Sequence, residues 1–135
     1  MADTLLLDAS VFVAAWDEDN ADRAAALGLV LDTDRPAAAL DLTMYEVANA
    51  IGARCGDRVG AARVCRSIER RCQENVVRIE RDLLEAAVDL AIEHRLTSYD
   101  ATYVAVARRH GWTLVSLDIK DLVSKGLAVT PDAAV

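Results

Sequence analysis

Four acidic residues lie far apart in the chain, each at the end of a predicted strand or in the first turn of a predicted helix. They are Asp8, Glu46, Asp100 and Asp118. Four carboxylates that met in one semi-enclosed pocket would repel one another, and divalent cations would relieve that repulsion. Metal binding is therefore the chemistry at stake, provided that the fold brings the four residues together.

The first of these acids follows three consecutive leucines, Leu5-Leu6-Leu7. Such an uninterrupted apolar run predicts a strand buried on both faces of a parallel sheet. Asp8 comes next, before a predicted helix at 9–16, and open α/β sheets place their ligands at the carboxyl ends of such strands. Capping of that helix is the simpler explanation of Asp8 taken alone.

Strands and helices are predicted to alternate along the chain, because short apolar runs separate segments of helical spacing. Further strands are predicted at 37–42, 76–79, 113–117 and 127–129. Further helices are predicted at 21–31, 43–54, 58–75, 82–94 and 97–110, with a short helix up to residue 125. This alternation predicts a single α/β domain, residues 1–135. We expect a three-layer α/β/α sandwich, in which a mostly parallel central sheet lies between two layers of helices.

That topology predicts that the four acids share one edge of the sheet. Asp8 and Asp118 follow strands, and Glu46 starts a helix just after a strand. The helix that begins near Asp100 leads into the strand before Asp118 and runs antiparallel to it. Its first turn should therefore lie over the carboxyl edge as well.

Helix capping offers an alternative for each of the other acids. Thr43-x-x-Glu46 has the form of a capping box, Thr97-x-x-Asp100 resembles one, and Asp118 is placed to cap the last short helix. Capping does not require that all the capped ends share one edge, so the joint pattern favours a metal site. Oxygen ligands without His or Cys indicate Mg²⁺ or Mn²⁺ rather than zinc.

Composition sets further limits. The net charge of −7, from 22 acids against 15 bases, argues against a protein that grips nucleic acid by its overall field. It leaves room for a local basic strip and for an acidic site that meets phosphate through metal ions. Three cysteines, Cys55, Cys65 and Cys72, have no framework spacing and predict reduced thiols in a cytoplasmic protein. We expect neither a secretory signal nor a membrane span.

Four motifs together resemble the PIN-domain family, and most closely the VapC-type ribonuclease toxins of toxin–antitoxin pairs. They are Leu-Asp-Ala-Ser-Val at 7–11, Thr-Met-Tyr-Glu-Val-Ala-Asn-Ala at 43–50, Tyr-Asp-Ala-Thr-Tyr-Val-Ala-Val-Ala at 99–107, and Leu-Val-Ser-Leu-Asp at 114–118. The resemblance covers essentially the whole chain, and the block around Asp100 is its most specific part.

The resemblance implies a ribonuclease that depends on Mg²⁺ or Mn²⁺. The same four acids would be its catalytic and metal-binding quartet, with Asp8 and Asp100 as direct ligands and the other two direct or through water. Ser10 matches the hydroxyl position that supports the first acid, and Ser116 stands where many members carry Thr. Asp121 would assist or replace Asp118. Family members also commonly form dimers and pair with a small antitoxin protein.

Contacts to the RNA substrate would come from basic residues outside the quartet. The candidates are Arg63, Arg66, Arg70 and Arg71 on the helix at 58–75, with Arg108 and Arg109 as a second basic spot. A solvated helix face with pairs such as Arg66–Glu69 is the ordinary alternative. The tyrosines Tyr45, Tyr99 and Tyr103 could stack on bases, although packing is the more usual role of aromatics at helical positions.

Three other functions stay open. A phosphotransfer domain would also place an Asp after its first strand, but the second Asp of the phosphatase motif and a Walker motif are both missing. A non-catalytic metal-binding module would have the same fold. A PIN nuclease of RNA processing, outside toxin–antitoxin biology, would have the same site.

Overall fold

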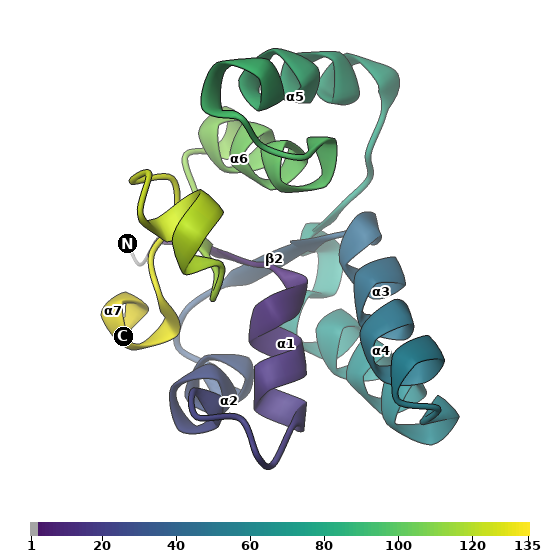
Figure 1. Cartoon of the computed structure of the whole chain (residues 1–135). Helices are drawn as coiled ribbons and strands as arrows, with labels where there is room; N and C mark the ends of the chain where they lie inside the picture. The colour runs from purple at the N-terminus through teal and green to yellow at the C-terminus, as the bar shows by residue number, and fades with distance from the viewer. Residues whose placement is uncertain (1–2) are drawn as a thin grey trace.

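A parallel four-stranded sheet lies between two layers of helices in the computed structural model, which describes residues 3–135 (Figure 1). The strands are β1 (Leu5–Leu7), β2 (Ala37–Leu40), β3 (Val76–Val77) and β4 (Thr113–Val115), in the order β3-β2-β1-β4. All pairs are parallel, as predicted, with Leu5 opposite Ala37 and Leu7 opposite Val115.

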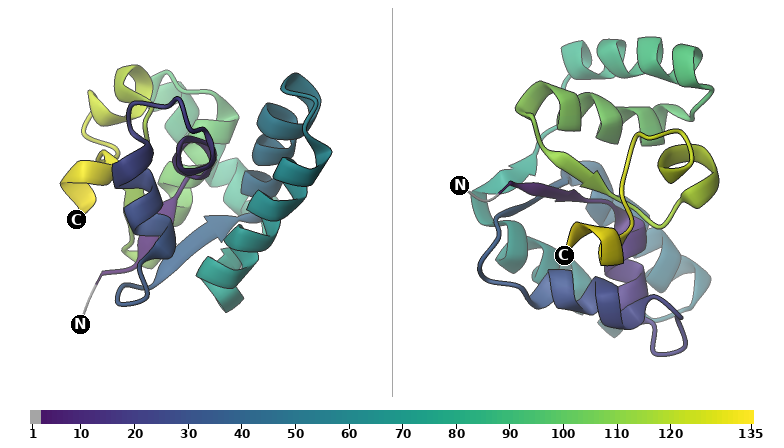
Figure 2. Two further views of the ribbon diagram at one scale, coloured as in Figure 1. Left: turned by 90° about the horizontal axis from the view of Figure 1, so that it is seen from below. Right: turned by 90° about the vertical axis from the view of Figure 1, so that its left-hand side faces the viewer.

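Helices cover both faces of this sheet (Figure 2, right). The longer α-helices are α1 (Ala9–Trp16), α2 (Arg23–Leu31), α3 (Asp41–Val47), α4 (Arg58–Cys72), α5 (Arg81–His94) and α6 (Ser98–His110). The shorter elements are η1 (Ala48–Arg54) and η3 (Ile119–Val123), both π-helical, η2 (Gln73–Asn75), a 3₁₀ turn, and α7 (Pro131–Ala134). Among residues 3–135, no helix is long and apolar enough to cross a membrane.

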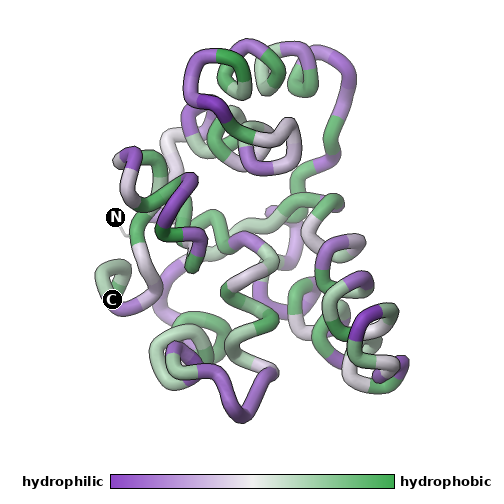
Figure 3. Tube along the Cα trace, in the orientation of Figure 1, coloured by the Kyte–Doolittle hydropathy of each residue, from purple (hydrophilic) through white to green (hydrophobic). Residues whose placement is uncertain are grey.

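The central strand β1 is buried on both faces, which explains its run of leucines. Leu5 and Leu7 pack in one core cluster with residues of α1, α2 and α4, whereas Leu6 packs in the other with residues of α5 and α6. All three side chains are inaccessible to solvent. Each contributes roughly 2 kcal/mol to folding on the usual scale of side-chain burial. The apolar centre of the sheet is also visible in Figure 3.

The strand order places a topological switch point between β1 and β4, and the region beyond the carboxyl ends of these two strands is called the crevice below. The chain moves from β1 to β2 to β3 in one direction across the sheet and then returns to place β4 on the other side of β1. The helices that connect β1, β2 and β3 include α1, α2 and α4 on one face of the sheet, whereas α5 and α6, which connect β3 to β4, lie on the other face. Open α/β sheets bind ligands at such a switch point, beyond the carboxyl ends of the strands.

Two predicted strands are too long, because side chains capture the amides that would continue them. The strand predicted at 113–117 ends at Val115, and the Leu117 amide donates to Ser10 Oγ. The strand predicted at 37–42 ends at Leu40, whose amide donates to Thr43 Oγ1, and α3 begins at Asp41. Asp118 therefore lies three residues beyond β4.

Other elements near these strands also differ from the prediction. The strand predicted at 76–79 has two residues, since the Ile79 amide donates to the Asp41 carboxylate. The strand predicted at 127–129 is a single bridge between Val115 and Val129, and α7 was not predicted. The helix predicted at 58–75 ends at Cys72.

Candidate metal centre

Asp8 combines helix capping with a buried position at the crevice. Its Oδ1 accepts hydrogen bonds from the Ser10 amide at 3.0 Å and from Ser10 Oγ at 2.5 Å. Ser10 Oγ in turn accepts from the amide of Leu117, in the segment that follows β4. The Asp8 side chain is only 6% exposed. Capping and a place in the acidic site are thus compatible, and the alternative raised for Asp8 does not exclude it from the site.

Asp100, Asp118 and Asp121 form the most compact acidic group. One carboxylate oxygen from each lies within 4.8 Å of the others. Asp100 is in the first turn of α6, where its amide donates to Thr97 Oγ1. Asp118 caps η3 by accepting from the amide of Asp121 at 3.0 Å. Asp118 and Asp121, the two candidates for the last acid, thus both lie beside Asp100.

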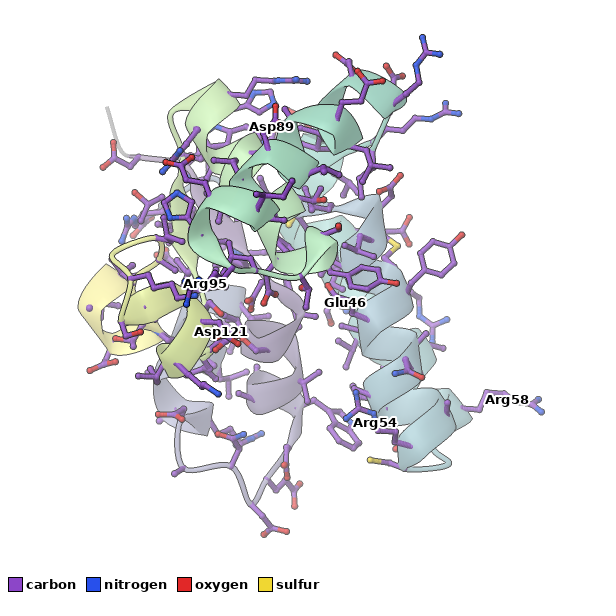
Figure 4. All side chains as sticks on the ribbon, turned by 45° about the horizontal axis from the view of Figure 1, so that its top comes forward. Glu46, Arg54, Arg58, Asp89, Arg95 and Asp121 are labelled. Atoms are coloured by element: carbon purple, nitrogen blue, oxygen red, sulfur yellow. The ribbon has the colours of Figure 1, made fainter. Side chains whose placement is uncertain are left out.

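Glu46 reaches the same edge from α3. It is the sixth residue of that helix, so the expectation that it starts the helix is wrong. The Thr43-x-x-Glu46 capping box is also wrong, because Thr43 lies inside the helix and its hydroxyl accepts from the Leu40 amide. Glu46 Oε1 accepts a hydrogen bond of 2.7 Å from the phenol of Tyr103 on α6. Glu46 on α3 and Asp121 on η3 are both labelled in Figure 4.

Electrostatics confirm that the acids are close together. Burial raises the pKa of Asp8 from 3.8 to about 6, with a smaller contribution from the charge of Glu46. Burial also raises the pKa of Asp100 to about 6, followed by repulsion from Asp118, Asp8 and Asp121. The pKa of Glu46 is raised by burial and by Asp100. The predicted convergence of the four acids on one edge is therefore what the structure shows.

The donor set fits a hard divalent cation. Every donor named above is a carboxylate oxygen, as Mg²⁺ and Mn²⁺ prefer. Among residues 3–135, the two side-chain ion pairs are Arg109–Asp82 and His94–Glu93, so none of the clustered acids has a basic partner within 4 Å. Burial, followed by repulsion between neighbouring carboxylates, raises the pKa of Asp8, Asp100 and Glu46, and a bound cation would favour their charged forms.

Ser116 occupies a supporting position beneath the acids. Its side chain is fully buried, its Oγ accepts from the Asp118 amide at 3.0 Å, and its hydrogen bond to Asp8 lowers the pKa of that residue. Ser10 and Ser116 thus connect the segments after β1 and β4, on the two sides of the crevice.

Several of the arginines proposed for RNA contact lie away from the acidic group. Arg70 and Arg71 line a cavity of about 680 Å³ together with the loops that precede β2 and β3, at the edge of the sheet opposite to the acids. Arg108 lines a second cavity with Gly111, which precedes β4, and Thr113, which begins it, at that same edge. Arg63 and Arg66 are exposed on α4, and the expected Arg66–Glu69 pair is not formed among the described residues.

Sequence reasoning missed the contacts of Tyr103 and Thr43, and it did not single out the basic residues Arg95 and Lys125. Tyr103 was assigned to packing or base stacking, yet its hydroxyl contacts Glu46, and Thr43 contacts Tyr103 in turn at 2.8 Å. The spacing from Asp100 to Tyr103, three residues on one helix, was the available signal. Arg95 is exposed in the turn before α6, and Lys125 donates to the carbonyls of His94 and Arg95. Arg95 is the C-terminal cap of α5 and lies five residues before Asp100 in the sequence.

Comparisons with known proteins identify the family of this chain. A family model described as the PIN domain matches residues 5–123. Ribonuclease VapC3 of Pyrobaculum aerophilum is 34% identical to this chain over 136 residues, which cover 94% of the chain and 98% of that protein. This chain belongs to the PIN-domain family.

Solved structures extend the comparison of this PIN domain. VapC20 of Mycobacterium tuberculosis, described as a toxin that cleaves the sarcin–ricin loop, has a TM-score of 0.74 at 22% identity, over 90% of this chain and 95% of that one. A chain of a toxin–antitoxin complex from Klebsiella pneumoniae has a TM-score of 0.71 at 23% identity, over 94% and 97%. These structures confirm the three-layer fold with a parallel sheet that the sequence predicted. The predicted resemblance to VapC-type proteins is likewise confirmed.

Proposed function

We propose that this PIN domain is an endoribonuclease that hydrolyses RNA phosphodiester bonds and depends on Mg²⁺ or Mn²⁺. The observation that carries the proposal is the group of five carboxylates, uncompensated by basic side chains, at the switch point of the sheet. The VapC3 relative, a ribonuclease by name, supports RNA as the substrate. Phosphotransfer and non-catalytic alternatives have no comparable support.

Each acid has a distinct proposed role. Asp8 and Asp100, the most perturbed pair, are the direct metal ligands, while Glu46 and the Asp118–Asp121 pair complete the site from either side. A bound divalent cation supplies charge neutralisation at the scissile phosphate and activation of water. Ser10 and Ser116 hold Asp8 and the segment before Asp118 in place, so that both sides of the crevice keep their geometry.

Hydrolysis of this type is expected to leave a 5′-phosphate and a 3′-hydroxyl on the products, because water attacks the phosphorus and the 3′ oxygen leaves. Neither His94 nor His110 belongs to the acidic group, so we expect no 2′,3′-cyclic phosphate from histidine acid–base catalysis. Cleavage-end mapping of cellular RNA with Mg²⁺, and with EDTA as control, checks this. Cyclic phosphate ends, or full cleavage in EDTA, would contradict the proposal.

RNA contacts are expected from the carboxyl edge rather than from the far edge. We expect Arg95→Ala to raise the KM for RNA and to lower the salt dependence of binding by about one phosphate contact. The matched variant Arg70→Ala removes the same charge at the opposite edge and is expected to change neither. Fluorescence anisotropy with a labelled RNA at several salt concentrations measures both. An effect of Arg70→Ala as large as that of Arg95→Ala would reject this placement of the RNA.

We further propose that the protein is the toxin of a VapBC-type pair and binds a small antitoxin. The support is the similarity to a chain of the Klebsiella pneumoniae toxin–antitoxin complex. A PIN nuclease of RNA processing is the remaining alternative. Copurification with the product of a small neighbouring gene, and loss of RNase activity in that complex, tests the pairing.

A homodimer in the cytoplasm is the proposed working state. Leu84, Val88 and Ile92 form an exposed apolar stripe on α5, at 44%, 41% and 76% exposure, which a second copy could cover. The three cysteines are free, as expected of a protein in a reducing compartment. The molecular mass in solution, measured by analytical ultracentrifugation, tests the dimer.

A further inference from the structure

A buried phenol links the two helices that carry Glu46 and Asp100. Tyr103 lies in the middle of α6 with 1% of its side chain exposed. Its hydroxyl is 2.7 Å from Glu46 Oε1 and 2.8 Å from Thr43 Oγ1, both on α3. A buried tyrosine needs a partner for its hydroxyl, but a partner drawn from the acidic site does more than satisfy the phenol.

The donors and acceptors in this chain of hydrogen bonds run in one direction. The Leu40 amide donates to Thr43 Oγ1. A carboxylate only accepts, so the single hydrogen of the Tyr103 phenol goes to Glu46. Thr43 must then give its own hydrogen to the phenol oxygen. The order is fixed by the backbone amide at one end and by the carboxylate at the other.

This arrangement ties the orientation of Glu46 to the element that carries Asp100. Asp100 and Tyr103 are three residues apart on α6 and share one face of that helix. A glutamate on its own retains several side-chain rotations and loses their entropy when it is held in one orientation. The phenol sets that orientation before any ligand binds, and Thr43 prevents the phenol from rotating away.

Asp8 is held by the same kind of chain on the other side of the crevice. There the Leu117 amide donates to Ser10 Oγ, and Ser10 Oγ donates to Asp8 Oδ1. In both cases a backbone amide at or just beyond a strand end donates to a hydroxyl oxygen. The Ser10 hydroxyl then donates directly to Asp8, whereas the Thr43 hydroxyl reaches Glu46 through the phenol of Tyr103. Ser10 is two residues from Asp8 in the sequence, whereas Tyr103 and Glu46 are 57 residues apart.

We propose that Tyr103, supported by Thr43, is a positioning residue that holds the Glu46 carboxylate in the orientation in which it completes the metal site. The inference rests on the proposed function, since it gives Glu46 a role in binding the cation. Tyr103 contacts neither the substrate nor the metal; it acts through Glu46. Partners of this kind around metal ligands typically change metal affinity or activity by 10- to 100-fold.

The test is Mn²⁺ binding to the full chain, measured by the loss of the free Mn²⁺ signal in electron paramagnetic resonance. We expect Tyr103→Phe to weaken binding by about 10-fold. In a Glu46→Gln background the same change is expected to have no further effect, because the residue through which Tyr103 acts is already altered. The control Tyr45→Phe removes a phenol from an exposed side chain on α3 and is expected to bind Mn²⁺ like the wild type.

A second pair of variants guards against a simple folding defect. Thr43→Val removes the hydroxyl that supports the phenol and is expected to weaken Mn²⁺ binding, whereas Thr43→Ser keeps the hydroxyl and is expected to restore it. Equal Mn²⁺ affinity in wild type, Tyr103→Phe and Thr43→Val would overturn the inference alone. An equal loss of Mn²⁺ affinity on Tyr103→Phe in the wild type and in the Glu46→Gln background would also overturn it. No Mn²⁺ binding by the wild type would overturn the proposed metal dependence together with the inference.

Discussion

Asp100→Asn is expected to lower Mg²⁺-dependent RNA cleavage by more than about 100-fold. Removal of a residue that only supports a metal ligand typically costs 10- to 100-fold, and we expect removal of a ligand itself to cost more. The same change is expected to leave the metal-free protein as stable as the wild type, or more stable. Burial, followed by repulsion from Asp118, Asp8 and Asp121, raises the pKa of Asp100 to about 6. A neutral amide of nearly the same shape removes that repulsion.

The matched control is Asp89→Asn on α5, which changes the same chemical group at an exposed position outside the acidic group (Figure 4). Initial rates on a defined RNA give the activity, and urea unfolding in EDTA gives the free energy of unfolding. Undiminished cleavage by Asp100→Asn would reject its assignment as a metal ligand. A large loss of stability would instead show that the carboxylate is needed for the fold.

The metal-free protein is expected to become more stable as the pH falls from about 8 to about 5. In the folded state the pKa of Asp8 is raised from 3.8 to about 6, and that of Asp100 to about 6, so the native state binds more protons than the unfolded state between these values. The free energy of unfolding therefore rises as the pH falls through 6 and stops rising once the unfolded chain is protonated as well. For Asp8, the shift corresponds to about 3 kcal/mol.

Urea unfolding in EDTA at several pH values measures this dependence. The double variant Asp8→Asn/Asp100→Asn lacks both groups, so its stability is expected to vary much less over the same range. Added Mg²⁺ is expected to stabilise the wild type at pH 8 and much less at pH 5, where protons compete for the carboxylates. A wild-type curve that matches the double variant at every pH would show that these carboxylates are not perturbed.

The placement of the acids was predictable because it follows from topology. Once Leu5–Leu7 and the strand before Asp118 are recognised as parallel, the ends of both strands must lie at one edge, and the antiparallel helix rule brings Asp100 there too. These rules depend on the order of elements and not on exact boundaries. Errors of two residues at Leu40 and Val115 left the conclusion unchanged.

The contacts between side chains were not predictable in the same way. Thr43 followed by Glu46 matches a capping box, but the helix starts earlier, and the hydroxyl instead serves the Leu40 amide and Tyr103. Whether a tyrosine at a helical position packs, stacks or donates to an acid depends on the distance between two helices, which the pattern of a single chain does not contain. The location of the arginines was not predictable for a related reason, since helical spacing places Arg70 on a face of α4 but not at one end of the sheet.

The double use of Asp8 affects how an inert form of the protein should be made. An alanine there would free the Ser10 amide and the Ser10 hydroxyl, and loosen the link to Leu117, so lost activity and a damaged first helix would be confounded. Asparagine is among the best helix-capping residues and keeps an oxygen where those donors point. Asp8→Asn is thus the substitution with which a silent but correctly shaped protein can be produced for trapping bound RNA.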